Sequence, residues 1–218
     1  MTVFRAVSAL LILVSLGGIA YDLRRRLGSW KAVRALLAHH AGNTGLVRRT
    51  EGQGARWRER FRKITYVLSG GLMGVLAVTG FFPVLFFGNH LSGFLLVIHV
   101  TVAPLFALAL SALALLWAHR MSFDDADWRM MEELGRRQRP GHEALVTFCL
   151  KSGFWIILAL SLPLMFTVIL GLFPLFGTEG EALLIRLHGY SALLLMLAAL
   201  AELYLTIITL DRSRTPIA

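Results

Sequence analysis

Cysteine is almost absent from this sequence. Cys149 is the only one, and it lies within an apolar stretch. A single cysteine excludes an intramolecular disulfide, a cysteine-ligated iron–sulfur cluster and the CxxCH attachment of covalent haem. The spacings typical of a zinc site, a phosphate-binding loop or a nucleophile–base pair are missing as well. Any cofactor must therefore be held by other side chains.

Charge is also scarce, at 16% of the residues, whereas 56% are hydrophobic. This apolar content exceeds what a soluble core of 218 residues can bury. A net charge of +9 would suggest nucleic acid as the partner of a soluble protein, but the basic residues here crowd between apolar runs. We therefore expect membrane lipid around the chain and no nucleic-acid partner.

Five apolar stretches are long enough to cross roughly 30 Å of hydrocarbon. They are residues 3–21, 64–87, 92–117, 145–174 and 182–210. Backbone groups in lipid must bond internally, and the alternating pattern of a barrel is missing, so each stretch is expected to be helical. The fold class predicted is an all-α integral membrane bundle of about five transmembrane helices. Because Arg24, Arg25 and Arg26 follow the first stretch without a small-residue cleavage site, we interpret that stretch as a retained signal-anchor.

Basic residues predict the orientation. The segment 22–63 is rich in arginine, and the loop 118–144 and the C-terminal tail are basic too. The positive-inside rule places these three in the cytoplasm and the N-terminus outside. Residues 29–40 have an amphipathic pattern expected to lie along the membrane surface. The aspartates in the loop 118–144 are interpreted as solvated and not as a metal site. They are Asp124, Asp125 and Asp127.

Two histidines, His99 and His188, lie inside apolar stretches. Each comes six to eight residues after its stretch begins at the outer face, roughly 9–12 Å along a helix axis. Two imidazoles at one level on separate helices are what axial ligation of a b-type haem needs. The alternative is that each is only hydrogen-bonded within the bundle. Arg186 is placed either to meet the haem propionates or to reach the interface as a snorkelling arginine.

A longer set of motifs resembles a known family. They are Arg60-Phe61-Arg62, Thr79-Gly80, Ile98-His99, Lys151-Ser152-Gly153-Phe154-Trp155 and Leu187-His188-Gly189-Tyr190-Ser191-Ala192. With these, the chain from residue 58 to residue 212 resembles the four-helix cytochrome b (gamma) subunit of formate dehydrogenases, nickel–iron hydrogenases and thiosulfate reductases. The resemblance implies two domains: residues 1–57, an anchor helix with a basic segment, and residues 58–218, a cytochrome b-like membrane domain.

That family holds two haems through four histidines, and only two of the positions match here. His99 and His188 correspond to the pair that ligates the haem nearer the outer face. Thr65 and Glu202 stand where the second pair would be. The resemblance therefore implies one haem b instead of two.

Lys151 and Glu202 are the charges within the apolar stretches. Each is about six to nine residues from the cytoplasmic end of its helix, so we expect an ion pair between them in the space of the missing haem. A role in quinone binding or proton relay is the alternative.

These observations together predict an electron-transfer subunit of the bacterial inner membrane. It would pass electrons between an iron–sulfur or c-type cytochrome subunit on the outer face and the quinone pool, and would anchor the larger oxidoreductase. Chemistry on a substrate would belong to the partner, since this chain offers no substrate site. Its rivals are a haem-free membrane anchor and, less well supported, a transporter.

Overall fold

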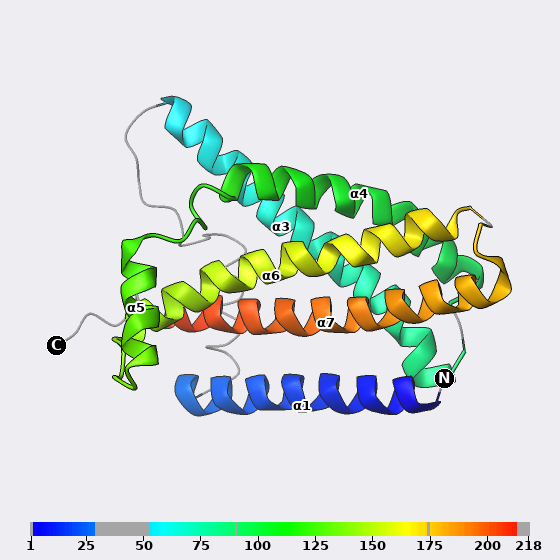
Figure 1. Cartoon of the computed structure of the whole chain (residues 1–218), viewed down its shortest axis with the longest axis horizontal. Coiled ribbons are helices and arrows are strands. Elements are labelled where there is room, and N and C mark those ends of the chain that lie inside the picture. Colours follow the sequence, from blue (N-terminus) through cyan, green and yellow to red (C-terminus); the bar gives the residue numbers. More distant parts are fainter. Residues whose placement is uncertain (1, 29–52, 90, 174, 213–218) are drawn as a thin grey trace. The chain divides into compact units, whose positions relative to one another are not determined.

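The computed structural model describes residues 2–28, 53–89, 91–173 and 175–212, and their regular structure is helical throughout (Figure 1). The long helices are α1 (Thr2–Leu27), α3 (Gln53–Phe82), α4 (Gly93–Trp117), α6 (His142–Gly171) and α7 (Gly177–Arg212). Together with the short extension of α3, these give five helices long and apolar enough to span a membrane. The predicted fold class, an all-α membrane protein with about five spans, is confirmed. The amphipathic segment predicted at residues 29–40 lies outside the described residues.

The chain packs as two compact units, Met1–Leu116 and Trp117–Ala218. The sequence predicted a boundary between residues 57 and 58, a position that falls inside α3. The first unit holds α1, α3 and α4, and the second holds α6 and α7 with a short helix, α5 (Asp125–Gly135). Each unit therefore contains one pair of long consecutive helices that are joined by a short connection.

In the first unit, α3 continues into a turn of π-helix, η1 (Pro83–Phe87). Pro83 has no N–H to donate to the preceding turn, and the wider spacing of a π-helix accommodates this loss. Gly88 ends η1 in a left-handed conformation with φ of 67°. The guanidinium of Arg5 on α1 donates from Nε to the carbonyl oxygen of Leu85 at 3.0 Å. This bond attaches α1 to the end of the α3–η1 helix.

Hydrogen bonds near both ends of the pair join α3 to α4. Near the start of α3, Nε of Arg62 donates to the carbonyl oxygen of Leu116 at 2.9 Å. Near the end of α3, Thr79 meets His99 of α4. The two helices are thus held together close to both ends of the pair.

In the second unit, α6 packs along α7, and α5 lies across the beginning of α6 (Figure 1). The loop before α5 is fixed to α6 by Nε1 of Trp155, which donates to the carbonyl oxygen of Met121 at 2.7 Å. Helix α5 begins with a capping box, in which Asp124 and Asp127 each accept a hydrogen bond from the other's backbone N–H. A helix inside the loop 118–144 was not predicted.

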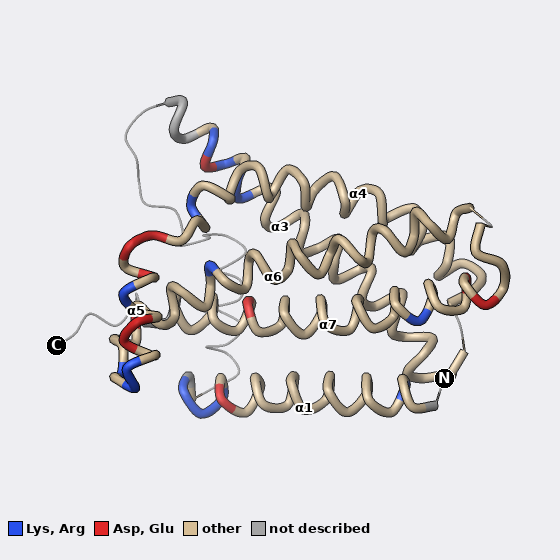
Figure 2. Tube along the Cα trace, viewed as in Figure 1, with Lys and Arg blue, Asp and Glu red and all other residues tan. Residues whose placement is uncertain are grey.

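Large apolar side chains are exposed along the long helices. Charged residues gather mainly near the helix ends (Figure 2). On α4, for example, Leu108 is 70% exposed and Leu115 is 85% exposed. Exposing leucine side chains to water along the whole length of a helix is unfavourable, whereas contact with lipid is favourable for them. The described helices therefore carry a surface for membrane lipid.

Candidate functional site

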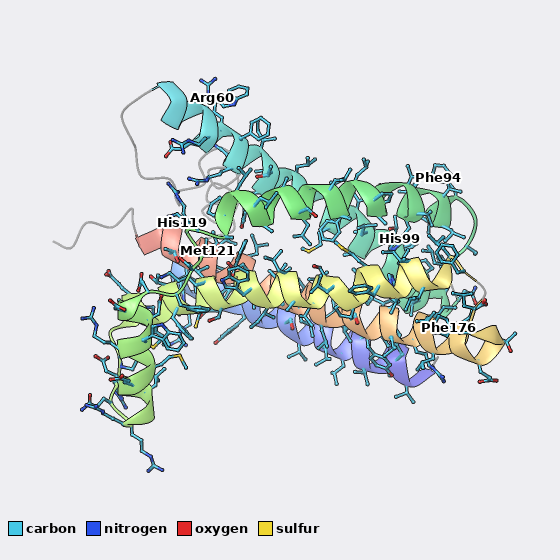
Figure 3. The ribbon with its side chains drawn as sticks, turned by 45° about the horizontal axis from the view of Figure 1, so that its top comes forward. Arg60, Phe94, His99, His119, Met121 and Phe176 are labelled. Atoms are coloured by element: carbon cyan, nitrogen blue, oxygen red, sulfur yellow. The ribbon has the colours of Figure 1, made fainter. Side chains whose placement is uncertain are left out.

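His99 is held in place by a threonine of the neighbouring helix. Its Nδ1 lies 2.9 Å from Oγ1 of Thr79 on α3, and the imidazole is half-buried. Figure 3 shows the residue on α4, toward the end of the helix that carries Phe94. The sequence singled out His99 but not Thr79, although the Thr79-Gly80 pair belonged to the family resemblance.

The hydroxyl of Thr79 indicates which nitrogen of His99 carries the proton. Oγ1 of Thr79 donates its single proton to the carbonyl oxygen of Val75 at 2.8 Å, with that of Leu76 at 3.2 Å. With its proton used on the backbone, Oγ1 is left as an acceptor for the N–H at Nδ1 of His99. This assignment puts the lone pair of the imidazole on Nε2, the form in which histidine binds a metal.

Gly80 lets His99 come this close to α3. A Cβ atom on Gly80 would lie 3.3 Å from Cε1 of His99 and 3.7 Å from Nδ1. The first distance is tighter than ordinary van der Waals contact. The next glycine along the helix, Gly74, has nothing within 4 Å of the same position. The missing side chain at Gly80 therefore makes room for the imidazole of His99, whereas the one at Gly74 makes room for no neighbouring residue.

His188 in the second unit has the same arrangement. Its Nδ1 lies 3.1 Å from Oγ1 of Thr167 on α6, and that hydroxyl donates to the carbonyl oxygen of Leu164 at 2.9 Å. If the proton of His188 is on Nδ1, Oγ1 of Thr167 is placed to accept it, and the lone pair is then on Nε2. Thr167 is buried and His188 is half-buried.

The same arrangement of a threonine and a histidine therefore occurs in both units. A threonine close to the end of one long helix orients a histidine on the next long helix, 20 residues later in the first unit and 21 in the second. Hydrogen bonding at Nδ1 that fixes the ring and its tautomer is usual for histidines that bind a metal through Nε2. The repeated spacing of threonine and histidine was readable in the sequence, and it is the signal that could have identified both threonines.

Arg186 is exposed on α7, two residues before His188, and makes no hydrogen bond or ion pair with any described residue. Its predicted contact with haem propionates stays a prediction.

Lys151 does not pair with Glu202, so the predicted ion pair is wrong. Its Nζ lies 2.5 Å from Oδ2 of Asp127 and 3.0 Å from Oδ2 of Asp124. The lysine stem is long enough to bring the ammonium to the start of α5, where two carboxylates meet it. Counting depth along α6 located the Cα atom of Lys151 but not the end of its side chain.

The interpretation of the aspartates as a solvated loop is wrong for Asp127, which is buried. Asp124 is 64% exposed. The hydrogen bond from Lys151 holds the pKa of the Asp124 carboxyl below its ordinary value of 3.8, and the backbone N–H of Asp127 lowers it further. These two aspartates therefore cap α5 and bind the ammonium of Lys151.

Glu202 lies on α7, and one oxygen of its carboxyl group has no hydrogen-bond partner among the described residues. Its Oε2 is buried and accepts no hydrogen bond within the described residues. The carboxyl rests against Gly153 of α6, so closely that a Cβ on Gly153 would overlap Oε2 and lie 3.1 Å from the carboxyl carbon. Glu202 thus occupies space that any larger residue at position 153 would need.

Comparison with family models, with curated proteins and with solved structures gives no match.

Proposed function

We propose that this chain is a b-type cytochrome of the bacterial inner membrane, with His99 and His188 as the two axial ligands of one haem b. The observation that carries the proposal is the pair of threonine–histidine hydrogen bonds, one in each unit. Both bonds favour the tautomer with the proton on Nδ1 and the lone pair on Nε2, which is the form of histidine that binds a metal.

The residues present fit this cofactor. A haem b bound by two imidazoles supplies one-electron transfer without substrate chemistry of the protein's own. Thr79 and Thr167 orient the ligands, and the apolar helices keep water from them. Arg186 is an exposed cation close in sequence to His188, which suits it to bind a propionate.

One haem is proposed instead of two, because the second pair of ligands is absent. Thr65 is buried, and its hydroxyl donates to carbonyl oxygens of its own helix, those of Phe61 and Arg62. Glu202 offers a carboxyl in place of an imidazole. Neither residue supplies the nitrogen ligand that the resembled family uses.

The proposed setting follows the family that the motifs resemble. The N-terminus lies outside and the C-terminus inside, with the basic segments in the cytoplasm. An iron–sulfur or c-type cytochrome subunit binds at the outer face, quinone is the second redox partner, and the chain anchors the complex. The basic residues near the start of α3, Arg58, Arg60 and Arg62, support this orientation.

The test is a visible spectrum of the purified chain, expressed with haem supplied. We expect a Soret peak and a sharp reduced α-band, and about one haem per chain by pyridine haemochrome, as one axial pair requires. His99→Ala and His188→Ala should each abolish or severely lower haem content while the chain still inserts. The exposed His119 provides the matched control, and His119→Ala should leave haem content unchanged.

Three results would contradict the proposal. A blank spectrum from inserted wild-type chain would favour the haem-free anchor. Full haem retention in both single histidine variants would exclude them as the ligands. A stoichiometry near two would show that a second site exists, with His119 among its candidate ligands.

A further inference from the structure

Glu202 is the one acidic residue of α7 far from the ends of its span, among the residues that the structure describes. The span runs from Gly177 to Thr209, so Glu202 stands seven residues, or roughly 10 Å, from the nearer end. Its neighbours one turn away are Ala198, Ala199, Leu205 and Thr206. The carboxyl is therefore surrounded along its own helix by groups that do not compensate a charge.

Among the described residues of the second unit, no cation forms an ion pair with this carboxyl. Lys151 lies on α6 only two residues from Gly153, but its ammonium is bound by Asp124 and Asp127. The other charged or basic side chains of α6, His142 and Glu143, belong to its first turn.

The nearest hydroxyl of α7 is also directed elsewhere. Oγ1 of Thr206 donates to the backbone oxygen of Glu202 and not to its side chain. Oε2 of Glu202 is buried and has no hydrogen bond among the described residues. The carboxyl thus lacks both a counter-ion and a donor for Oε2 among the described residues.

Burying an ionised carboxylate here costs desolvation free energy that no counter-ion and no hydrogen bond to Oε2 offsets. The neutral acid avoids most of that cost. We propose that Glu202 is a proton-binding site in the membrane, a carboxylic acid that takes up and releases a proton without a partner cation. Gly153 completes the site, because its missing side chain gives the carboxyl a place against the backbone of α6. The proton is the only ligand, and the proposal stands whether or not haem is bound.

A hydrophobic carbodiimide tests this directly. Dicyclohexylcarbodiimide reacts with a protonated carboxyl in apolar surroundings: the carboxyl proton moves to one nitrogen, an oxygen bonds to the central carbon, and the adduct rearranges to a stable N-acylurea without another reactant. We expect peptide mass spectrometry of the full chain at neutral pH to find the adduct on Glu202. Glu179 and Glu181, near the start of α7, should carry none.

A water-soluble carbodiimide with an added amine gives the reverse control. It should modify Glu179 and leave Glu202 unmodified. Modification of Glu202 by the water-soluble reagent alone would show a solvated carboxyl and overturn the proposal.

Two variants separate this proposal from its rival, an ion pair with Lys151. Lys151→Met should leave the modification of Glu202 unchanged, and a several-fold increase would show that Lys151 had neutralised a carboxylate. Gly153→Ala should lower the modification several-fold by displacing the carboxyl. Its control is Gly171→Ala on the same helix, where a Cβ meets nothing within 4 Å.

An infrared measurement does not depend on access of a reagent. The spectrum of wild-type chain minus that of Glu202→Gln should contain the carbonyl band of a protonated carboxylic acid at neutral pH. A carboxylate band in its place would overturn the proposal. Neither measurement requires haem, so a failure here is distinct from a failure of the proposed cytochrome.

Discussion

Nζ of Lys151 and Oδ2 of Asp127 lie 2.5 Å apart, with 10% of one side chain and 6% of the other exposed. The same Asp127 oxygen accepts the backbone N–H of Asp124 in the capping box of α5. The Asp127 carboxylate therefore helps to cap α5 and also binds α5 to α6. Removing the Lys151 charge would leave Asp127 buried without a counter-ion, whereas removing the Asp127 charge would leave Lys151 only the more exposed carboxylate of Asp124 at 3.0 Å.

We predict that Asp127→Asn lowers the free energy of unfolding by about 2–3 kcal/mol, because the buried Lys151 ammonium then keeps only the more exposed carboxylate of Asp124 as its counter-ion. Denaturant titration of the full chain in mixed micelles measures this. Asp125→Asn is the control, since Asp125 is exposed in the same turn, and should change stability by no more than about 0.5 kcal/mol. The double variant Lys151→Met with Asp127→Leu should recover much of the loss. Additive losses would show that the two residues do not stabilise each other.

Acid should weaken the same junction. The pKa of Asp124 is lowered in the folded chain by the hydrogen bond from Lys151, so the unfolded chain, with its ordinary value near 3.8, binds the proton more readily. The contribution of Asp124 to stability is therefore complete above that value and is lost as the pH falls below about 4. Stability measured against pH should fall less steeply in this range for Asp124→Asn than for wild type. Identical slopes would mean that Asp124 does not contribute.

The spans could be predicted from the sequence, because hydrocarbon thickness and the absence of water dictate long apolar helices. His99 and His188 stood out for the same reason, as costly polar groups in such helices. Helix α5 was missed because it is short and lies in a charged loop, although Asp124 and Asp127 have the spacing of a capping box. The partner of Lys151 was missed because its ammonium lies at the end of a flexible stem, far from its Cα atom.

The threonines next to the histidines provide a test that leaves the ligands in place. Thr79→Val and Thr167→Val keep the shape of the side chain and remove the acceptor for Nδ1–H. We expect each to weaken haem binding by about 10–100-fold, the usual effect of losing an orienting partner of a metal ligand. Haem titration of the apoprotein measures it. Thr206→Val is the matched control: Thr206 is a buried threonine whose hydroxyl also bonds to its own helix, and it should bind haem as wild type does. An equal loss in all three variants would mean a general effect on folding.

Gly80→Ala should separate stability from haem binding. In a helix, alanine is favoured over glycine by roughly 0.5–1 kcal/mol, so the substitution by itself stabilises α3. The added methyl group, however, would lie 3.3 Å from Cε1 of His99, and the imidazole must move by a few tenths of an ångström from the position set by Thr79. Haem affinity should therefore fall several-fold while the unfolding midpoint stays the same or rises. Gly74→Ala on the same helix has open space around the new methyl group, so it should stabilise without any loss of haem. Wild-type haem affinity in Gly80→Ala would show that the position of His99 against α3 does not matter for the ligand, and the bond to Thr79 would then be only a packing contact.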